Sequence, residues 1–240
     1  MVHSFRAFRA FRPDEAWPNP TCCACGSGRY YGNGNQVRLA LFLIAFILSL
    51  GSSRAGQDHA CSQPNGCGSS TIIIPLHVDN QSKQVQLTDA ASGVDFDIYG
   101  NGHPVRVAWI ADDSAAFLAV DRDGDGKITS GKELFGDSTD QNHNGFLALD
   151  DYTGHGAKID ALNPRWNTLL LWTDLNHNGI SEPGELQPVS KVLKRISTGA
   201  IYTGTKDSFG NLYEWQGRAW YLDKPEPRPI YDVTLLTLPE

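Results

Sequence analysis

Asp121-Arg-Asp-Gly-Asp-Gly-Lys-Ile128 places three carboxylates at alternating positions and follows the third with a glycine. Holding like charges this close together is costly unless a cation offsets their repulsion. Oxygen ligands without thiol or imidazole groups favour Ca²⁺ or Mg²⁺ over zinc or copper. The calcium loop template takes side chains at positions 1, 3, 5 and 12, a carbonyl at 7 and glycine at 6. The ligands expected here are Asp121, Asp123, Asp125, the Lys127 carbonyl and Glu133, which comes one residue late.

A second stretch, Asp174-Leu-Asn-His-Asn-Gly-Ile-Ser-Glu-Pro-Gly-Glu185, fits the same template at its standard spacing. Asp, Asn and Gly also build plain turns, so a single loop of this kind is weak evidence. Two loops in one short chain favour metal binding over turns alone. The expected ligands are Asp174, Asn176, Asn178, the Ile180 carbonyl and Glu185.

Two further stretches fit the template less well. Asp97–Asn101 has its outline, but Tyr99 stands where an oxygen ligand is expected, so a hairpin turn is the favoured interpretation. The stretch 150–160 is rich in carboxylates at a spacing that fits no standard loop. Both remain open as additional cation sites.

The front of the chain differs in composition from the rest. Leu39–Leu50 is an apolar run after Arg38, too short to span a bilayer comfortably and typical of a signal-peptide core. Ser53-Arg-Ala55 supplies a small-residue cleavage pattern. We therefore predict a signal peptide over residues 37–55 and a secreted or periplasmic protein. Residues 1–36 are interpreted as an extension from a mis-assigned start site.

The predicted mature chain is acidic and long enough for one domain. The whole chain carries a net charge of −7, and residues 56–240 hold 14 Lys and Arg against 25 Asp and Glu. This charge argues against nucleic-acid binding. Residues 56–70 form a leader with Cys61 and Cys67, which either form a local disulfide or remain free thiols. Residues 71–240 are predicted to form one calcium-binding domain with no stable membrane span.

Apolar runs and turn signals predict an α+β fold of antiparallel hairpins, or a meander, with short helices and EF-hand-like loops. Helices are expected at 115–120, before the first loop, at 145–151, and after Glu185. Strands are expected at 71–78, 84–87, 94–98, 105–110, 167–173, 195–202, 212–221 and 230–238.

Four segments resemble the EF-hand-like calcium-binding modules of secreted bacterial proteins, of the kind found near haemolysin-type calcium-binding repeats. They are Phe117–Ile128, Glu133–Asp137, Asn144–Leu149 and Leu171–Leu186. The resemblance implies calcium at the ten ligands named above and supplies no enzymatic activity. It departs from the family pattern at 150–160, where Tyr152 and His155 replace expected loop residues.

Three roles remain as alternatives to simple calcium binding. A dockerin-like adhesion module is disfavoured because its loops lie close together as a tandem repeat, whereas these start 53 residues apart. A secreted hydrolase is disfavoured because the carboxylates lie at metal-loop spacing and no nucleophile elbow or metalloprotease motif occurs. An unidentified protein or cell-surface partner remains open.

Overall fold

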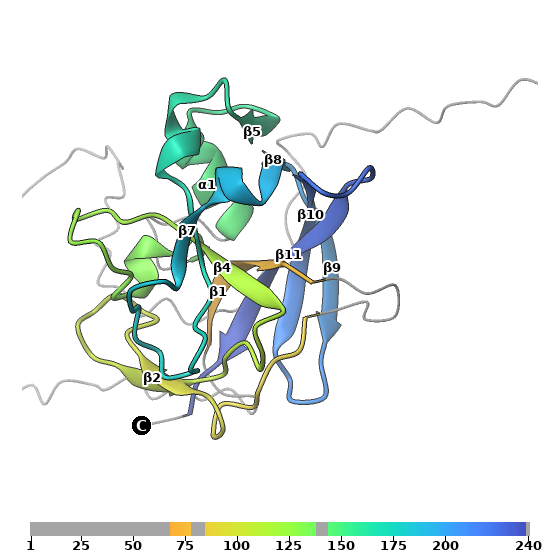
Figure 1. Ribbon diagram of the computed structural model, residues 1–240. Coiled ribbons are helices and arrows are strands. Elements are labelled where there is room, and N and C mark those ends of the chain that lie inside the picture. The colour runs from red at the N-terminus through yellow and green to blue at the C-terminus, as the bar shows by residue number, and fades with distance from the viewer. Residues whose placement is uncertain (1–67, 78–84, 138–143, 239–240) are drawn as a thin grey trace, which may run out of the picture. The chain divides into compact units, whose positions relative to one another are not determined.

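The computed structural model describes residues 68–77, 85–137 and 144–238, and strands dominate these segments (Figure 1). The main sheet is antiparallel and runs β5–β8–β10–β11–β1–β4–β6–β7, with β9 beside β10. Its strands are β1 (Gly68–Pro75), β4 (Ala115–Ala119), β5 (Lys158–Asp160), β6 (Leu170–Trp172), β7 (Leu186–Pro188), β8 (Leu193–Ser197), β9 (Ile201–Lys206), β10 (Leu212–Tyr221) and β11 (Arg228–Leu236). A separate hairpin pairs β2 (Val94–Phe96) with β3 (Val105–Val107).

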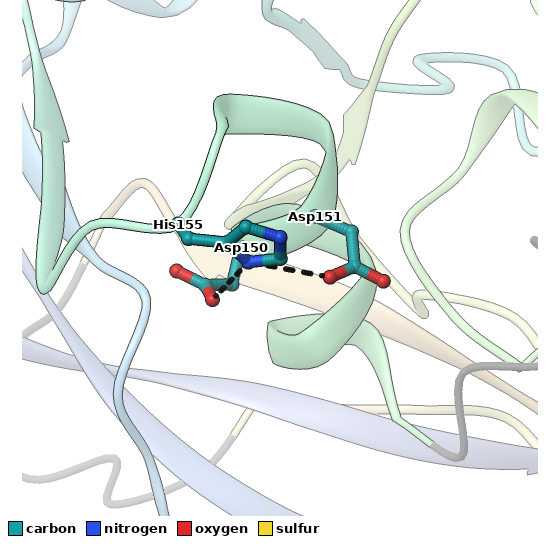
Figure 2. A group of neighbouring side chains, drawn as sticks. All are labelled: Asp150, Asp151 and His155. Atoms are coloured by element: carbon teal, nitrogen blue, oxygen red, sulfur yellow. Dashed lines mark hydrogen bonds and ion pairs between the residues drawn. The ribbon is translucent and has the colours of Figure 1, made fainter.

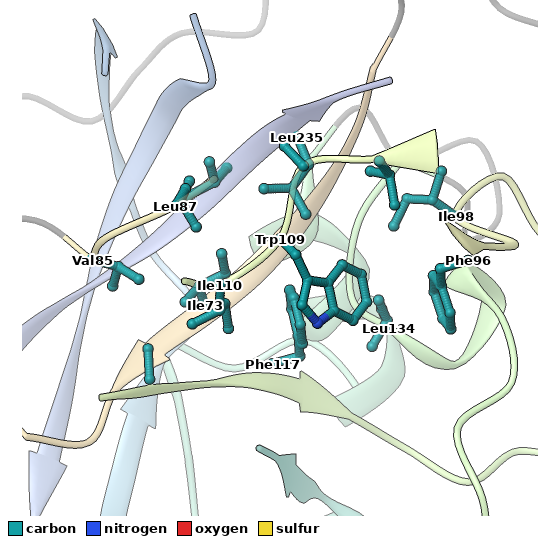
Figure 3. Packing of buried hydrophobic residues seen from close by; sticks show 14 of the residues in the cluster. Ile73, Val85, Leu87, Phe96, Ile98, Trp109, Ile110, Phe117, Leu134 and Leu235 are labelled. Atoms are coloured by element: carbon teal, nitrogen blue, oxygen red, sulfur yellow. The ribbon is translucent and has the colours of Figure 1, made fainter. Parts of the chain in front are cut away.

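The central strands β1 and β4 are buried on both faces. Ile73 and Phe117 face one apolar cluster, which Figure 3 shows around Trp109, whereas Ile72 and Leu118 face a second. A strand covered on both sides needs apolar residues at every position. The continuous runs in these two strands follow from that placement between two core layers.

One α-helix, α1 (Gly145–Thr153), occurs in the described segments, together with the short 3-10 helices η1 (Gly131–Glu133), η2 (Pro164–Thr168) and η3 (Val189–Lys191). Asn144 begins α1 by accepting a hydrogen bond from the Leu147 N–H, and Gly154 ends it in the left-handed region. Phe146 and Leu149 of α1 pack into the second cluster.

The predicted α+β class is wrong, because the described residues form an antiparallel β-sheet with a single α-helix. The main error concerns residues 115–120, which were expected to form a helix. Residues 115–119 instead form β4, paired with both β1 and β6. Burial between two strands overrides the helical propensity of alanine. The predicted helix after Glu185 is likewise replaced by β7.

Asp232 is an acidic residue in the middle of β11 with no exposed surface. Its Oδ2 accepts a hydrogen bond from the Gly145 N–H at the start of α1, 3.0 Å away, and its Oδ1 has no hydrogen-bond partner. Burial raises the pKa of Asp232 to about 8. Glu214 and Asp137 face it and reinforce the shift by charge repulsion.

The predictions for residues 1–67, including the signal peptide, the upstream extension and the cysteine pair, lie outside the described residues. Within the segments that the structure does describe, no helix combines the length and apolar character needed to cross a bilayer.

Candidate functional site

The first Asp-rich segment forms a closed loop, loop 121–133, which follows β4 and ends with η1. Asp121 receives the N–H groups of Gly124 and Gly126 on its two carboxylate oxygens, at 2.7 and 2.9 Å. Carboxylate oxygens of Asp121, Asp123 and Glu133 lie within 4.8 Å of one another. Loop 121–133 therefore brings together three of the five residues predicted as its ligands, on a scale suited to one cation.

The late glutamate closes loop 121–133 from within the core. Glu133 is only 4% exposed, and its two carboxylate oxygens accept N–H groups from Arg122 at 3.3 Å and Thr129 at 2.7 Å. The 3-10 turn η1 ends at Glu133. This tight turn accommodates the extra residue and returns the carboxylate to the loop.

The second loop, loop 174–185, connects β6 to β7. Asp174 accepts N–H groups from Asn178 at 3.2 Å and Gly179 at 2.8 Å. Glu185 accepts N–H groups from Leu175 and from Glu182, each at 3.0 Å. Both end carboxylates are buried, as Glu133 is.

The two loops share one backbone conformation despite their different lengths. In each, the closing glutamate accepts the N–H groups of positions 2 and 9, and its own carbonyl accepts the N–H of the residue before position 1. Positions 4 and 6 have positive φ in both: Gly124 and Gly126 in the first, His177 and Gly179 in the second. Glu133 and Glu185 are therefore equivalent although their sequence spacing differs.

The other predicted ligands lie on the exposed side of the loops. Asp125 and Asn178 occupy position 5, and each accepts the N–H of position 7, at 2.8 and 2.7 Å. Asn176 donates a short hydrogen bond from its amide nitrogen to Glu182. Lys127 and Ile180 are exposed, and their predicted contribution is a backbone carbonyl. Among the described residues, the five predicted ligands of loop 174–185 are not seen to gather around one point.

The buried carboxylates of the two loops have no cationic side chain to neutralise them. Among ion pairs between described residues, none involves Glu133, Asp174 or Glu185. A buried carboxylate is costly unless it is paired, hydrogen-bonded or bound to a metal. Backbone N–H groups supply the hydrogen bonds, and a cation in each loop would supply the missing charge.

Two tryptophans contact the end carboxylates of loop 174–185, and sequence reasoning predicted neither contact. The Trp109 indole N–H donates to Asp174 at 2.8 Å, and the Trp172 indole N–H lies 3.4 Å from Glu185. The two rings pack edge to face with centroids 5.5 Å apart. The sequence gives one hint of these contacts, which is that Trp172 lies two residues before Asp174.

The weaker stretch at residues 97–102 has the same conformation as the start of the two loops. Asp97 accepts N–H groups from Asn101 and Gly102, and Asn101 accepts the N–H of His103. Gly100 and Gly102 have positive φ at positions 4 and 6. The Tyr99 hydroxyl, at position 3, is hydrogen-bonded to Thr237, so the segment offers no cation ligand there.

The acidic stretch at 150–160 brings together Asp150, Asp151 and His155 at the end of α1 (Figure 2). The His155 Nδ1 lies 3.2 Å from Asp150 and 3.5 Å from Asp151, and Asp150 also accepts the Gly156 N–H. The side chain of His155 is 73% exposed. This cluster shares neither the conformation nor the burial of the two loops.

Comparison with known proteins places most of the described chain in one family. The model of the SPM domain matches residues 76–235, which include both loops and the 97–102 segment. The chain is 30% identical over 157 residues to the iron-regulated protein FrpA of Neisseria meningitidis serogroup C. That alignment covers 62% of this chain and 14% of FrpA, so the chain spans only a small part of its relative's length.

Proposed function

We propose that this chain, which belongs to the SPM domain family, is an exported, non-catalytic protein that binds calcium in loops 121–133 and 174–185. Bound calcium would hold the two loops closed and complete the packing beneath them. The activity of the much longer relative gives no guide to this role, because the similarity covers only a fraction of that protein.

The observation that carries the proposal is the match between the two loops. Independent sequences at 121–133 and 174–185 present an acidic side chain at position 1 and a buried closing glutamate in the same hydrogen-bonded frame. A structural turn has no need for uncompensated buried carboxylates. The donor set of carboxylates, amides and carbonyls suits a hard cation.

Calcium is favoured over magnesium by the layout of the donors. Calcium accepts six to eight oxygens in flexible geometry, whereas magnesium requires a near-ideal octahedron and retains several waters. Asp121, Asp123 and Glu133 present up to six carboxylate oxygens before any carbonyl is counted. A donor-rich, irregular loop of this kind matches the larger ion.

Isothermal titration of the purified protein is expected to show two calcium equivalents. Asp121→Ala and Glu185→Gln should each remove about one, because each deletes an end carboxylate from one loop. The matched control is Asp113→Ala, an exposed carboxylate outside both loops, which should retain two equivalents. A wild-type titration with no heat, or variants with unchanged stoichiometry, would show that the loops are only turns.

Export is proposed from Arg38, the apolar run Leu39–Leu50 and the cleavage pattern ending at Ala55. N-terminal sequencing of the protein recovered from outside the cytoplasm is expected to begin at or near Gly56. Recovery of a mature protein that retains Leu39–Leu50 would contradict this proposal. Mass spectrometry of the precursor also tests the start site, because peptides from residues 5–30 would show that the upstream extension is translated.

A further inference from the structure

We propose that the two loops bind calcium cooperatively, and that the β2–β3 hairpin with its 97–102 turn is the element that couples them. This inference rests on the proposed calcium binding and adds a regulatory property to the same sites. It follows from contacts that β2 makes at its two ends and from the aromatic cluster between them.

The first end of β2 lies against loop 174–185. Gly179, at position 6 of that loop, approaches β2 so closely that an added Cβ would lie 2.8 Å from the Val94 Cγ2 and 3.0 Å from the Asp95 carbonyl oxygen. The Gly179 N–H is also one of the two that Asp174 accepts. The position of Val94 is therefore tied to the conformation of loop 174–185.

The other end of β2 holds loop 121–133. The Asp97 carbonyl accepts the Gly131 N–H at 2.8 Å, and Asp97 and Ser130 form an isolated β-bridge. The aliphatic part of Lys132 covers Gly100, where an added Cβ would lie 2.6 Å from its Cγ. Gly131 and Lys132 directly precede the closing Glu133, so this end of β2 positions the glutamate.

β2 has only three residues, so about 10 Å separates its contacts with the two loops. Between them, Phe96 packs on Trp109 and Trp172, with ring centroids 5.3 and 5.5 Å away. These are the two tryptophans whose indoles face Asp174 and Glu185. Ile128 and Leu134 of the first loop region lie in the same buried cluster.

The conformation of the 97–102 segment explains how the β2–β3 hairpin can link the two loops. Asp97 accepts the N–H of position 6, as Asp121 and Asp174 do, yet Tyr99 replaces a ligand and bonds Thr237 instead. The segment thus holds its shape by side-chain and backbone bonds alone. Because the turn keeps its own conformation, a change in the position of β2 at one loop is passed to the other loop rather than absorbed in the turn.

Cooperativity follows because ordering either loop orders the shared element. A first calcium ion must fix its own loop and also β2 and the cluster around Phe96. The second ion then binds a protein in which that cost has already been met, so its affinity is higher. Coupling of this kind is reciprocal and changes affinity about five-fold or more.

Calcium binding to loop 174–185 can be followed by tryptophan fluorescence, since Trp109 and Trp172 contact the carboxylates of that loop. In Asp121→Ala, which disables the first loop, the midpoint of this calcium titration is expected to rise about five-fold or more. An unchanged midpoint, with calcium still bound, would overturn cooperativity and leave the proposed function standing. Loss of all calcium binding by the wild type would instead overturn the proposed function.

The role of β2 in the coupling is tested by measuring the effect of Asp121→Ala on the calcium midpoint again in a Val94→Ala background. Removing the Val94 methyl groups that pack against Gly179 should retain two calcium equivalents but clearly reduce the effect of Asp121→Ala. The matched control is Val233→Ala, which deletes the same atoms from the same buried cluster on β11. This control should preserve the five-fold effect. A five-fold effect that persists in Val94→Ala would show that the packing of Val94 on Gly179 does not carry the coupling.

Discussion

Calcium at about 10 mM is expected to raise the melting temperature of the protein by roughly 6–20 °C relative to EDTA. Extracellular calcium modules bind with dissociation constants of about 10⁻⁴–10⁻³ M. A ligand at ten to a hundred times that value stabilises the native state by about 1.4–2.7 kcal/mol per site. Two sites therefore contribute about 3–5 kcal/mol, which is a large share of the stability of one domain.

The physical origin of this effect is the set of buried carboxylates. Glu133, Asp174 and Glu185 are at most 6% exposed and take part in no ion pair with a described residue. Without the cation, these groups repel their neighbours in the loops. Ile128 and Trp172, which pack in the cluster beneath, are then expected to be less well ordered.

Calorimetry in EDTA, magnesium and calcium checks this prediction. Magnesium should give a smaller shift than calcium because it keeps its waters and requires an octahedral site. The double variant Asp121→Ala/Glu185→Gln should melt at one temperature in all three conditions, whereas Asp113→Ala should respond like the wild type. Identical wild-type melting curves in EDTA and calcium would rule out calcium-linked stability.

The loops were accessible to sequence reasoning because their conformation is determined locally. Alternating carboxylates and glycines at fixed spacing favour the same turn, and the sequence places Glu133 at the end of the first loop despite its offset; its role as a ligand stays a prediction. The structure of the segments around the loops could not be predicted in this way. Ala115–Ala119 has helical propensity on its own, and only its placement between β1 and β6 makes it a strand. Sequence periodicity carries no information about those neighbours.

Long-range polar contacts were missed for the same reason. Trp109 lies 65 residues before Asp174, and no local pattern links an indole to a distant carboxylate. Asp232 lies in a strand predicted from apolar residues, and the sequence gives no sign that it is fully buried and accepts a hydrogen bond from the first residue of α1. Such pairings depend on the register of the whole sheet.

Asp232→Asn is expected to increase the free energy of unfolding by about 2–4 kcal/mol at pH 7. In the folded protein burial raises the pKa of Asp232 to about 8, from its ordinary value of 3.8. Between these values the folded protein binds one more proton than the unfolded chain, so stability falls as pH rises, by about 1.4 kcal/mol per unit. Asparagine keeps an oxygen for the Gly145 N–H and is neutral without taking up a proton.

Urea unfolding at several pH values between 5 and 8, in saturating calcium, measures this difference. The advantage of Asp232→Asn over the wild type should grow with pH across that range, because only the wild type takes up a proton at position 232 on folding. Asp113→Asn, an exposed carboxylate, is the matched control and should follow the wild-type pH dependence. A constant difference between Asp232→Asn and the wild type would mean that Asp232 is ionised in the folded protein. Its charge would then have to be balanced by groups other than Glu214 and Asp137, which only add repulsion.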